Sequence, residues 1–163
     1  MRSKIARAQQ TAWRRPLIWL VALGCGLCDV AAEVAAQTLT DRDRAALMST
    51  WRGYWTDRGY LYEARLSLRC ADDNSIDGEI HWTLRRSPRQ QEQARLGLRS
   101  FEYIKGRYDP STRKLEFEGH DLGSQAGILG HDKYRLTLSP NALVIEGITW
   151  SHGPWTGRLK LLR

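Results

Sequence analysis

Five residues that could bind a ligand fall on the inward face of strands that the sequence predicts: Glu102, Tyr108, Thr149, Trp55 and Trp82. Glu102 is the most informative of them, because it shares its face with Ile104 and Gly106. A carboxylate among apolar neighbours has to be paired, hydrogen-bonded or neutralised. We interpret these residues as the lining of a ligand mouth, with polar groups fixing orientation and an indole giving apolar contact. The alternative is a strand end at which Glu102 reaches solvent.

Motifs for catalysis or metal binding are weak or missing. Gly-His-Asp occurs at 119–121 and at 130–132, and the two copies flank the loop 122–129. They would bind a divalent metal only if the ends of this loop met, and no short ligand spacing supports such a site. The chain contains no Gly-x-Ser-x-Gly, no His-Glu-x-x-His and no phosphate loop. We therefore expect no metal, no cofactor and no enzymatic activity.

A β-sheet must position the candidate ligand residues, because apolar and polar residues alternate along most of the chain after residue 50. Alternation with period 2 is typical of strands that bury one face. Turn-forming residues separate the runs at short intervals, which favours antiparallel neighbours joined by hairpins. The expected strands cover residues 50–57, 60–70, 75–86, 99–108, 113–119, 132–139, 142–150 and 155–162. A short helix is expected over 40–48, with Thr40 or Asp41 as its cap.

An apolar residue, any residue and then glycine recur six times in these strands. The glycines are Gly53, Gly78, Gly106, Gly119, Gly147 and Gly157, and each falls on the inward face. Glycine weakens a strand interior, so its repetition in phase needs a geometric reason. A sheet that closes on itself bends strongly, and inward glycines relieve crowding at the bends. The sequence therefore predicts an all-β domain over 50–163, an eight-stranded antiparallel up-and-down β-barrel, with a β-sandwich as the alternative.

The first predicted strand carries Trp-x-Gly-x-Trp at 51–55, and similar motifs recur at 104–109 and 155–158. This pattern resembles the avidin and lipocalin group of calycin-type up-and-down barrels. The resemblance covers short strand motifs within 50–162 and implies the architecture alone. No ligand-binding residues of those families are recognisable, so biotin or retinoid binding does not follow from it.

Aromatic residues dominate the predicted barrel interior. By parity the inward ones are Trp51, Trp55, Tyr62, Trp82, Phe117, Tyr134 and Trp155. Barrels of this size either fill their interior with side chains or hold one small ligand. The sequence favours a filled core and leaves an apolar pocket as the alternative.

Residues 1–36 read as a secretory signal peptide. A basic start precedes an apolar run at 17–28, and small residues follow in the pattern that a signal peptidase recognises. Cleavage after Ala32 or after Ala36 fits equally well, and residues 37–49 would form a linker with the short helix. We expect a periplasmic or secreted product. A retained signal, or lipidation of Cys25, would instead tether the protein to a membrane.

Net charge and cysteine content limit the classes of partner and covalent bond that we expect for the mature chain. The net charge of +7 falls to +4 once the signal's five basic and two acidic residues are removed. Both signs interleave without a basic stripe, which argues against a nucleic-acid partner. Cys70 is then the single cysteine of the mature chain, and its parity makes it a small buried hydrophobe.

Two surface features remain as candidate contact regions. Val144, Ile148 and Trp150 form an outward apolar row, which either meets a protein partner or packs under the short helix. The polar, basic loop 86–95 could gate a barrel mouth. We predict an exported, non-catalytic binding module for a small, partly apolar ligand or a cell-envelope component. The alternative is a structural or protein-interaction barrel that acts through its outer face.

Overall fold

The computed structural model describes residues 39–122, 131–151 and 155–163. The predicted signal peptide, and most of the loop between the two Gly-His-Asp motifs, lie outside the described residues. The elements are α1 (Asp41–Leu47), β1 (Thr50–Asp57), β2 (Tyr60–Cys70), β3 (Ser75–Arg86), a 3-10 helix η1 (Gln90–Arg95), β4 (Arg99–Asp109), β5 (Lys114–Leu122), β6 (Asp132–Leu138), β7 (Val144–Ser151) and β8 (Thr156–Leu162). No helix within these described ranges is long and apolar enough to cross a bilayer.

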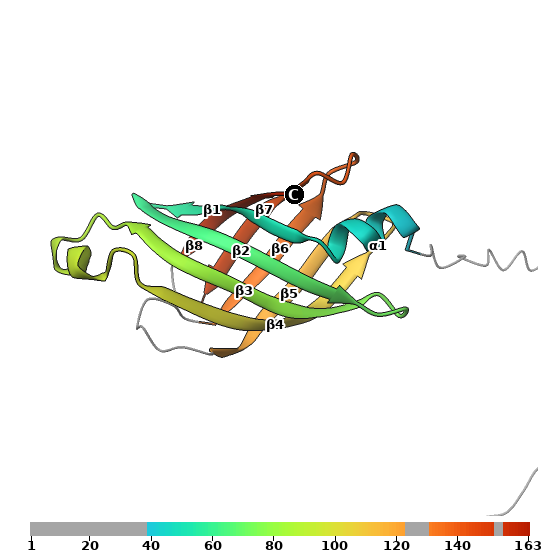
Figure 1. Cartoon of the computed structure of the whole chain (residues 1–163), viewed down its shortest axis with the longest axis horizontal. Helices are drawn as coiled ribbons and strands as arrows, with labels where there is room; N and C mark the ends of the chain where they lie inside the picture. The colour runs from blue at the N-terminus through green and yellow to red at the C-terminus, as the bar shows by residue number, and fades with distance from the viewer. Residues whose placement is uncertain (1–38, 123–130, 152–154) are drawn as a thin grey trace, which may run out of the picture. The chain divides into compact units, whose positions relative to one another are not determined.

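The eight strands form one closed barrel in sequence order, and every neighbouring pair is antiparallel. Pairing between β1 and β8, with Gly53 opposite Leu161, closes the sheet. The predicted eight-stranded up-and-down barrel is therefore confirmed, and the β-sandwich alternative is wrong. Figure 1 shows α1 at one end of the barrel, here called the helix end, and the β3–β4 connection at the other, the distal end.

Most predicted boundaries hold to within a residue, and the exceptions have local causes. The helix begins after Thr40, whose side chain accepts a hydrogen bond from the backbone N–H of Asp43. β5 runs to Leu122, three residues beyond the predicted end, through a register shift opposite Tyr103 and Ile104. β7 begins at Val144 rather than at 142, because a turn precedes it in which Ala142 has a φ of 57°.

The barrel interior is packed with large apolar side chains. Five of the seven predicted inward aromatics are buried, namely Trp51, Trp55, Trp82, Phe117 and Tyr134. The other two, Tyr62 and Trp155, pack against the core and remain partly exposed. Burial of such a side chain stabilises the fold by about 2 kcal/mol. Cys70 is half-buried against the same core, and burial raises the pKa of its thiol.

The repeated glycines mark places where the barrel wall leaves no room for a side chain. A Cβ at Gly53, Gly78, Gly106 or Gly147 would lie against a backbone carbonyl oxygen of the neighbouring strand, that of Lys160, Ser67, Glu116 or Arg135 respectively. A Cβ at Gly119 would meet the Glu102 carboxylate, and one at Gly157 would meet the Trp55 ring. Most of these glycines thus permit close strand approach, whereas Gly119 and Gly157 make space for interior side chains.

The helix end is closed by α1 through several specific contacts. The indole N–H of Trp51 donates to the Ala46 carbonyl oxygen at 3.1 Å. The Tyr108 hydroxyl donates to Asp43 at 2.8 Å, and the Arg113 guanidinium pairs with the same carboxylate oxygen at 2.7 Å. These contacts hold α1 across this end of the barrel.

Replacing Gly78 with alanine tests the close strand approach. We expect Gly78→Ala to lower the free energy of unfolding by about 3 kcal/mol, because the new Cβ would overlap the Ser67 carbonyl oxygen. Urea denaturation measures the loss. The control is Glu79→Ala, which alters an outward-facing neighbour and should shift stability by no more than about 0.5 kcal/mol. Equal, small effects of both substitutions would contradict the tight packing.

Candidate functional site

One layer of the interior, near the distal end, takes a residue from each strand. In strand order these residues are Trp55, Tyr62, Trp82, Glu102, Gly119, Tyr134, Thr149 and Gly157, and we call them the polar layer. The indole N–H of Trp55 donates to the Thr149 hydroxyl at 2.6 Å. The Tyr62 ring packs edge-on against the rings of both Trp55 and Trp82, at 5.6 and 6.3 Å between centroids. Hydrogen bonds and ring contacts thus link the strands across the interior.

Glu102 is the centre of the polar layer. Its side chain is 0% exposed. The carboxylate accepts hydrogen bonds from the Tyr134 hydroxyl at 2.5 Å and from the backbone N–H of Asp132 at 2.9 Å. No Lys or Arg among the described residues forms an ion pair with it. Burial therefore raises the pKa of Glu102, and the two hydrogen bonds oppose that rise.

Asp132 forms an acidic pair with Glu102. Burial, together with the charge on Glu102, raises the pKa of Asp132 to about 7. Hydrogen bonds stabilise the ionised form of Glu102, whereas no hydrogen bond to the Asp132 carboxyl is found within the described residues. As pH rises towards 7, the pair therefore retains a proton more readily on Asp132 than on Glu102.

The Trp82 indole N–H is an unsatisfied donor in the same layer. Trp82 is 3% exposed, and its Nε1 has no hydrogen-bond partner among the described residues. The group lies close enough to the Glu102 carboxylate to favour its ionised form, but not in hydrogen-bonding geometry. A buried donor without a partner costs about 1–3 kcal/mol. An acceptor atom of a ligand would recover that cost.

Aromatic rings continue from the polar layer towards the distal end. Tyr60 stacks with Tyr62 at 6.4 Å and meets Trp155 edge-on at 5.3 Å. The guanidinium carbon of Arg89 lies 5.9 Å from the Tyr60 ring centroid and 5.5 Å from that of Trp155. Because Tyr62, Trp155 and Asp132 are only partly buried, they connect the polar layer to the outside.

The structure brings together four of the five predicted ligand residues, Glu102, Thr149, Trp55 and Trp82. Tyr108 does not lie with them, because it bonds to Asp43 at the helix end. Alternation fixes the face of a strand but not the height along it, and six residues separate Tyr108 from Glu102, or about 20 Å at 3.3 Å per residue. The alternative in which Glu102 reaches solvent is wrong, since its side chain is fully buried.

Sequence reasoning missed the role of two residues in this site. The sequence predicts Tyr134 only as an inward aromatic of the core, yet its hydroxyl donates to Glu102. Asp132 stands out in the sequence only as a candidate metal ligand beside His131. Its parity with Tyr134 along one strand was the signal that would have placed it inward. Among the described residues, no group of three or more His, Cys, Asp or Glu side chains has the geometry to hold a metal ion.

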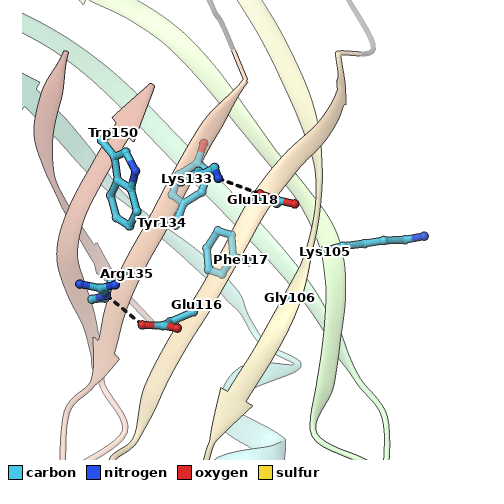
Figure 2. Close-up of a pocket in the computed structure, with 9 residues that line it drawn as sticks. All are labelled: Lys105, Gly106, Glu116, Phe117, Glu118, Lys133, Tyr134, Arg135 and Trp150. Carbon is cyan, nitrogen blue, oxygen red and sulfur yellow. Dashed lines mark hydrogen bonds and ion pairs between the residues drawn. The ribbon is translucent and has the colours of Figure 1, made fainter. Parts of the chain in front are cut away.

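A hollow of about 290 Å³ lies on the outer wall over β4 to β7 (Figure 2). The outward side chains that line it are Lys105, Glu116, Glu118, Lys133, Arg135 and Trp150. Arg135 pairs with Glu116 at 2.8 Å and lies 5.5 Å from the Trp150 ring centroid. Lys133 pairs with Glu118 at 3.5 Å. The hollow is therefore charged at its outer side, and Phe117 and Tyr134 also line it, the latter a member of the polar layer.

Comparison with models of known protein families, with curated proteins and with solved structures found no match to this chain. The closed eight-stranded antiparallel up-and-down barrel is consistent with a calycin-like architecture. Architecture alone assigns no ligand, so the site has to be interpreted from its own residues.

The acidic pair predicts a pH dependence of stability that depends on Asp132. Its pKa in the folded chain exceeds its unfolded value of about 3.9, so its contribution is fully present below that pH and is lost as pH rises to about 7. Asp132→Asn keeps the backbone N–H that donates to Glu102 and removes this titration. Relative to the variant, the wild type should lose about 2 kcal/mol between about pH 4.5 and 7.5 in urea denaturation. A stability gap that stays constant over this range would contradict a raised pKa of the partly buried Asp132.

Proposed function

We propose that this chain is an exported, non-catalytic binding module that holds a small, partly apolar ligand at the distal end of its barrel. A molecule of the cell envelope is the most direct source of such a ligand for a periplasmic or secreted protein. The signal-peptide pattern of residues 1–36 supports export. The aromatic rings and acidic pair at the distal end support ligand binding.

The observation that carries this proposal is that two buried polar groups of the polar layer lack partners that a ligand could provide. Glu102 is a fully buried carboxylate without a described basic partner, and Trp82 beside it has a buried donor without an acceptor. Proteins rarely leave buried polar groups unsatisfied, and such groups concentrate at functional sites. A ligand with both a donor and an acceptor group would complete them.

The distal end is the better location for this ligand than the helix end. At the helix end, Asp43 already has a tyrosine donor and an arginine partner, and α1 covers the interior. The large buried side chains also occupy the middle of the barrel. A ligand would therefore enter the distal end next to Tyr62, Trp155 and Asp132, which are partly exposed.

A neutral fluorescent probe with one N–H donor, N-phenyl-1-naphthylamine, tests this proposal. We expect it to bind the exported protein with increased fluorescence, and we expect Glu102→Gln to weaken binding about tenfold, because a charge-assisted hydrogen bond becomes a neutral one. The matched control is Asp43→Asn, which neutralises the tyrosine-bonded buried carboxylate of the helix end. This control should leave probe affinity unchanged.

Two results would count against the proposal. One is no binding of the probe by a protein whose near-ultraviolet circular dichroism shows a folded state. The other is equal weakening by Glu102→Gln and Asp43→Asn, which would point to a general loss of stability. Native mass spectrometry of the exported protein gives a second measure, through the mass of any co-purifying ligand.

A second candidate function, as an interaction barrel, is favoured by the outer face of β7. Ile148 is 42% exposed, and Trp150 borders the charged hollow over β4 to β7. The expected alternative, packing of this row under the helix, does not account for Ile148, because its side chain is exposed. The exposed row and the neighbouring ion pairs fit a protein partner with mixed apolar and charged side chains.

Site-specific photo-crosslinking in the exporting cell distinguishes this second function. A photoreactive residue at position 148 should yield an adduct of one defined mass if the outer face meets a partner. The control position is 65, which is exposed on the outer face of β2. Adducts of equal yield at both positions, or none at either, would remove the outer face from consideration.

A further inference from the structure

Arg89 places a cation on the aromatic rings of the distal end. Its guanidinium lies over the rings of Tyr60 and Trp155, and the two rings meet edge-on. A cation within about 6 Å of an aromatic centroid is attracted by the negative face of the ring. The chain thereby shows, with its own side chain, that these rings form a seat for an organic cation.

The other contacts of Arg89 are weak enough for the side chain to leave. Among the described residues its ion pair is with Glu92 at 3.3 Å, and half of the Arg89 side chain is exposed. An exposed pair of this kind contributes about 0–1 kcal/mol. The backbone of the segment is held separately, because the N–H of Arg89 donates to Ser87, whose hydroxyl donates to Glu92. Removal of the guanidinium therefore leaves the β3–β4 connection anchored.

One ionised carboxylate, that of Glu92, borders this seat. Glu92 lies beside Tyr60, and a hydrogen bond from Ser87 lowers the pKa of its carboxyl, so that it stays ionised. Tyr62, which stacks on Tyr60, lies within electrostatic range of Glu92 and also of Arg95. The ionised Glu92 therefore favours a cation over a neutral or anionic molecule at the neighbouring rings.

We propose that the ligand of the distal end is a small organic cation, whose quaternary ammonium or guanidinium head displaces Arg89 from Tyr60 and Trp155. This inference rests on the proposed function and names the chemical class of its ligand. In the unliganded chain Arg89 occupies the seat and competes with the ligand. Removal of the Arg89 side chain therefore increases the affinity of the seat for a cation and does not increase it for a neutral molecule of the same shape.

Choline and its neutral carbon isostere, 3,3-dimethyl-1-butanol, test this proposal in NMR titrations that follow the indole N–H signals of the full exported protein. We expect choline to shift the Trp155 signal, and Arg89→Ala to bind choline about fivefold more tightly than the wild type. The isostere should show no such gain. The charge-matched control is Arg99→Ala, which removes an exposed arginine at the start of β4 and should leave choline affinity unchanged.

The remaining outcomes separate the two proposals. If Arg89→Ala gains no affinity for choline, or gains equally for the isostere, the cation seat is wrong. If the neutral naphthylamine probe still binds in a Glu102-dependent manner, the proposed ligand site stands and only the cationic class falls. If neither choline nor the naphthylamine probe binds the folded protein, both proposals fall.

Discussion

Closure of the sheet between β1 and β8 is the constraint on which the other features depend. A closed barrel has no free edge and excludes water from its interior. The closure requires neighbouring backbones to approach so closely that a Cβ at Gly53 would overlap the Lys160 carbonyl oxygen. Glu102, Tyr134 and the Trp82 indole are therefore kept in a dry environment, where each unpaired polar group is costly.

The two ends of the barrel satisfy a buried carboxylate in opposite ways. Asp43 receives a hydrogen bond from a tyrosine and an ion pair from Arg113. Glu102 receives a hydrogen bond from a tyrosine and a backbone N–H, and no described arginine or lysine pairs with it. The helix end is thus internally neutralised, whereas the buried carboxylate of the distal end has hydrogen bonds but no described basic partner. This asymmetry is the physical basis for assigning ligand binding to the distal end.

The alternation of side chains and the repeated glycines were enough to predict the strands, their order and the closed sheet. These signals depend on the local geometry of each strand, and the residue types along the strand reflect that geometry directly. The height of a residue along the barrel depends on strand stagger, and so Tyr108 could not be separated from Glu102 in advance. The partner of Glu102 could not be predicted either, because the β5–β6 pairing decides which strand reaches it. The seat of Arg89 depends on the 3-10 turn of residues 90–95, for which the polar sequence carries no periodic signal.

The central claim is that closure of the barrel keeps Glu102 away from water and holds Asp132 partly buried beside it. Carbon-13 NMR titration of the side-chain carboxyl groups of Glu102 and Asp132 measures this directly. We predict that both carboxyl groups titrate above their ordinary range, with Asp132 at about 7. Titration of both groups near their ordinary values of about 4 would show that water reaches them, and would contradict the closed, dry interior.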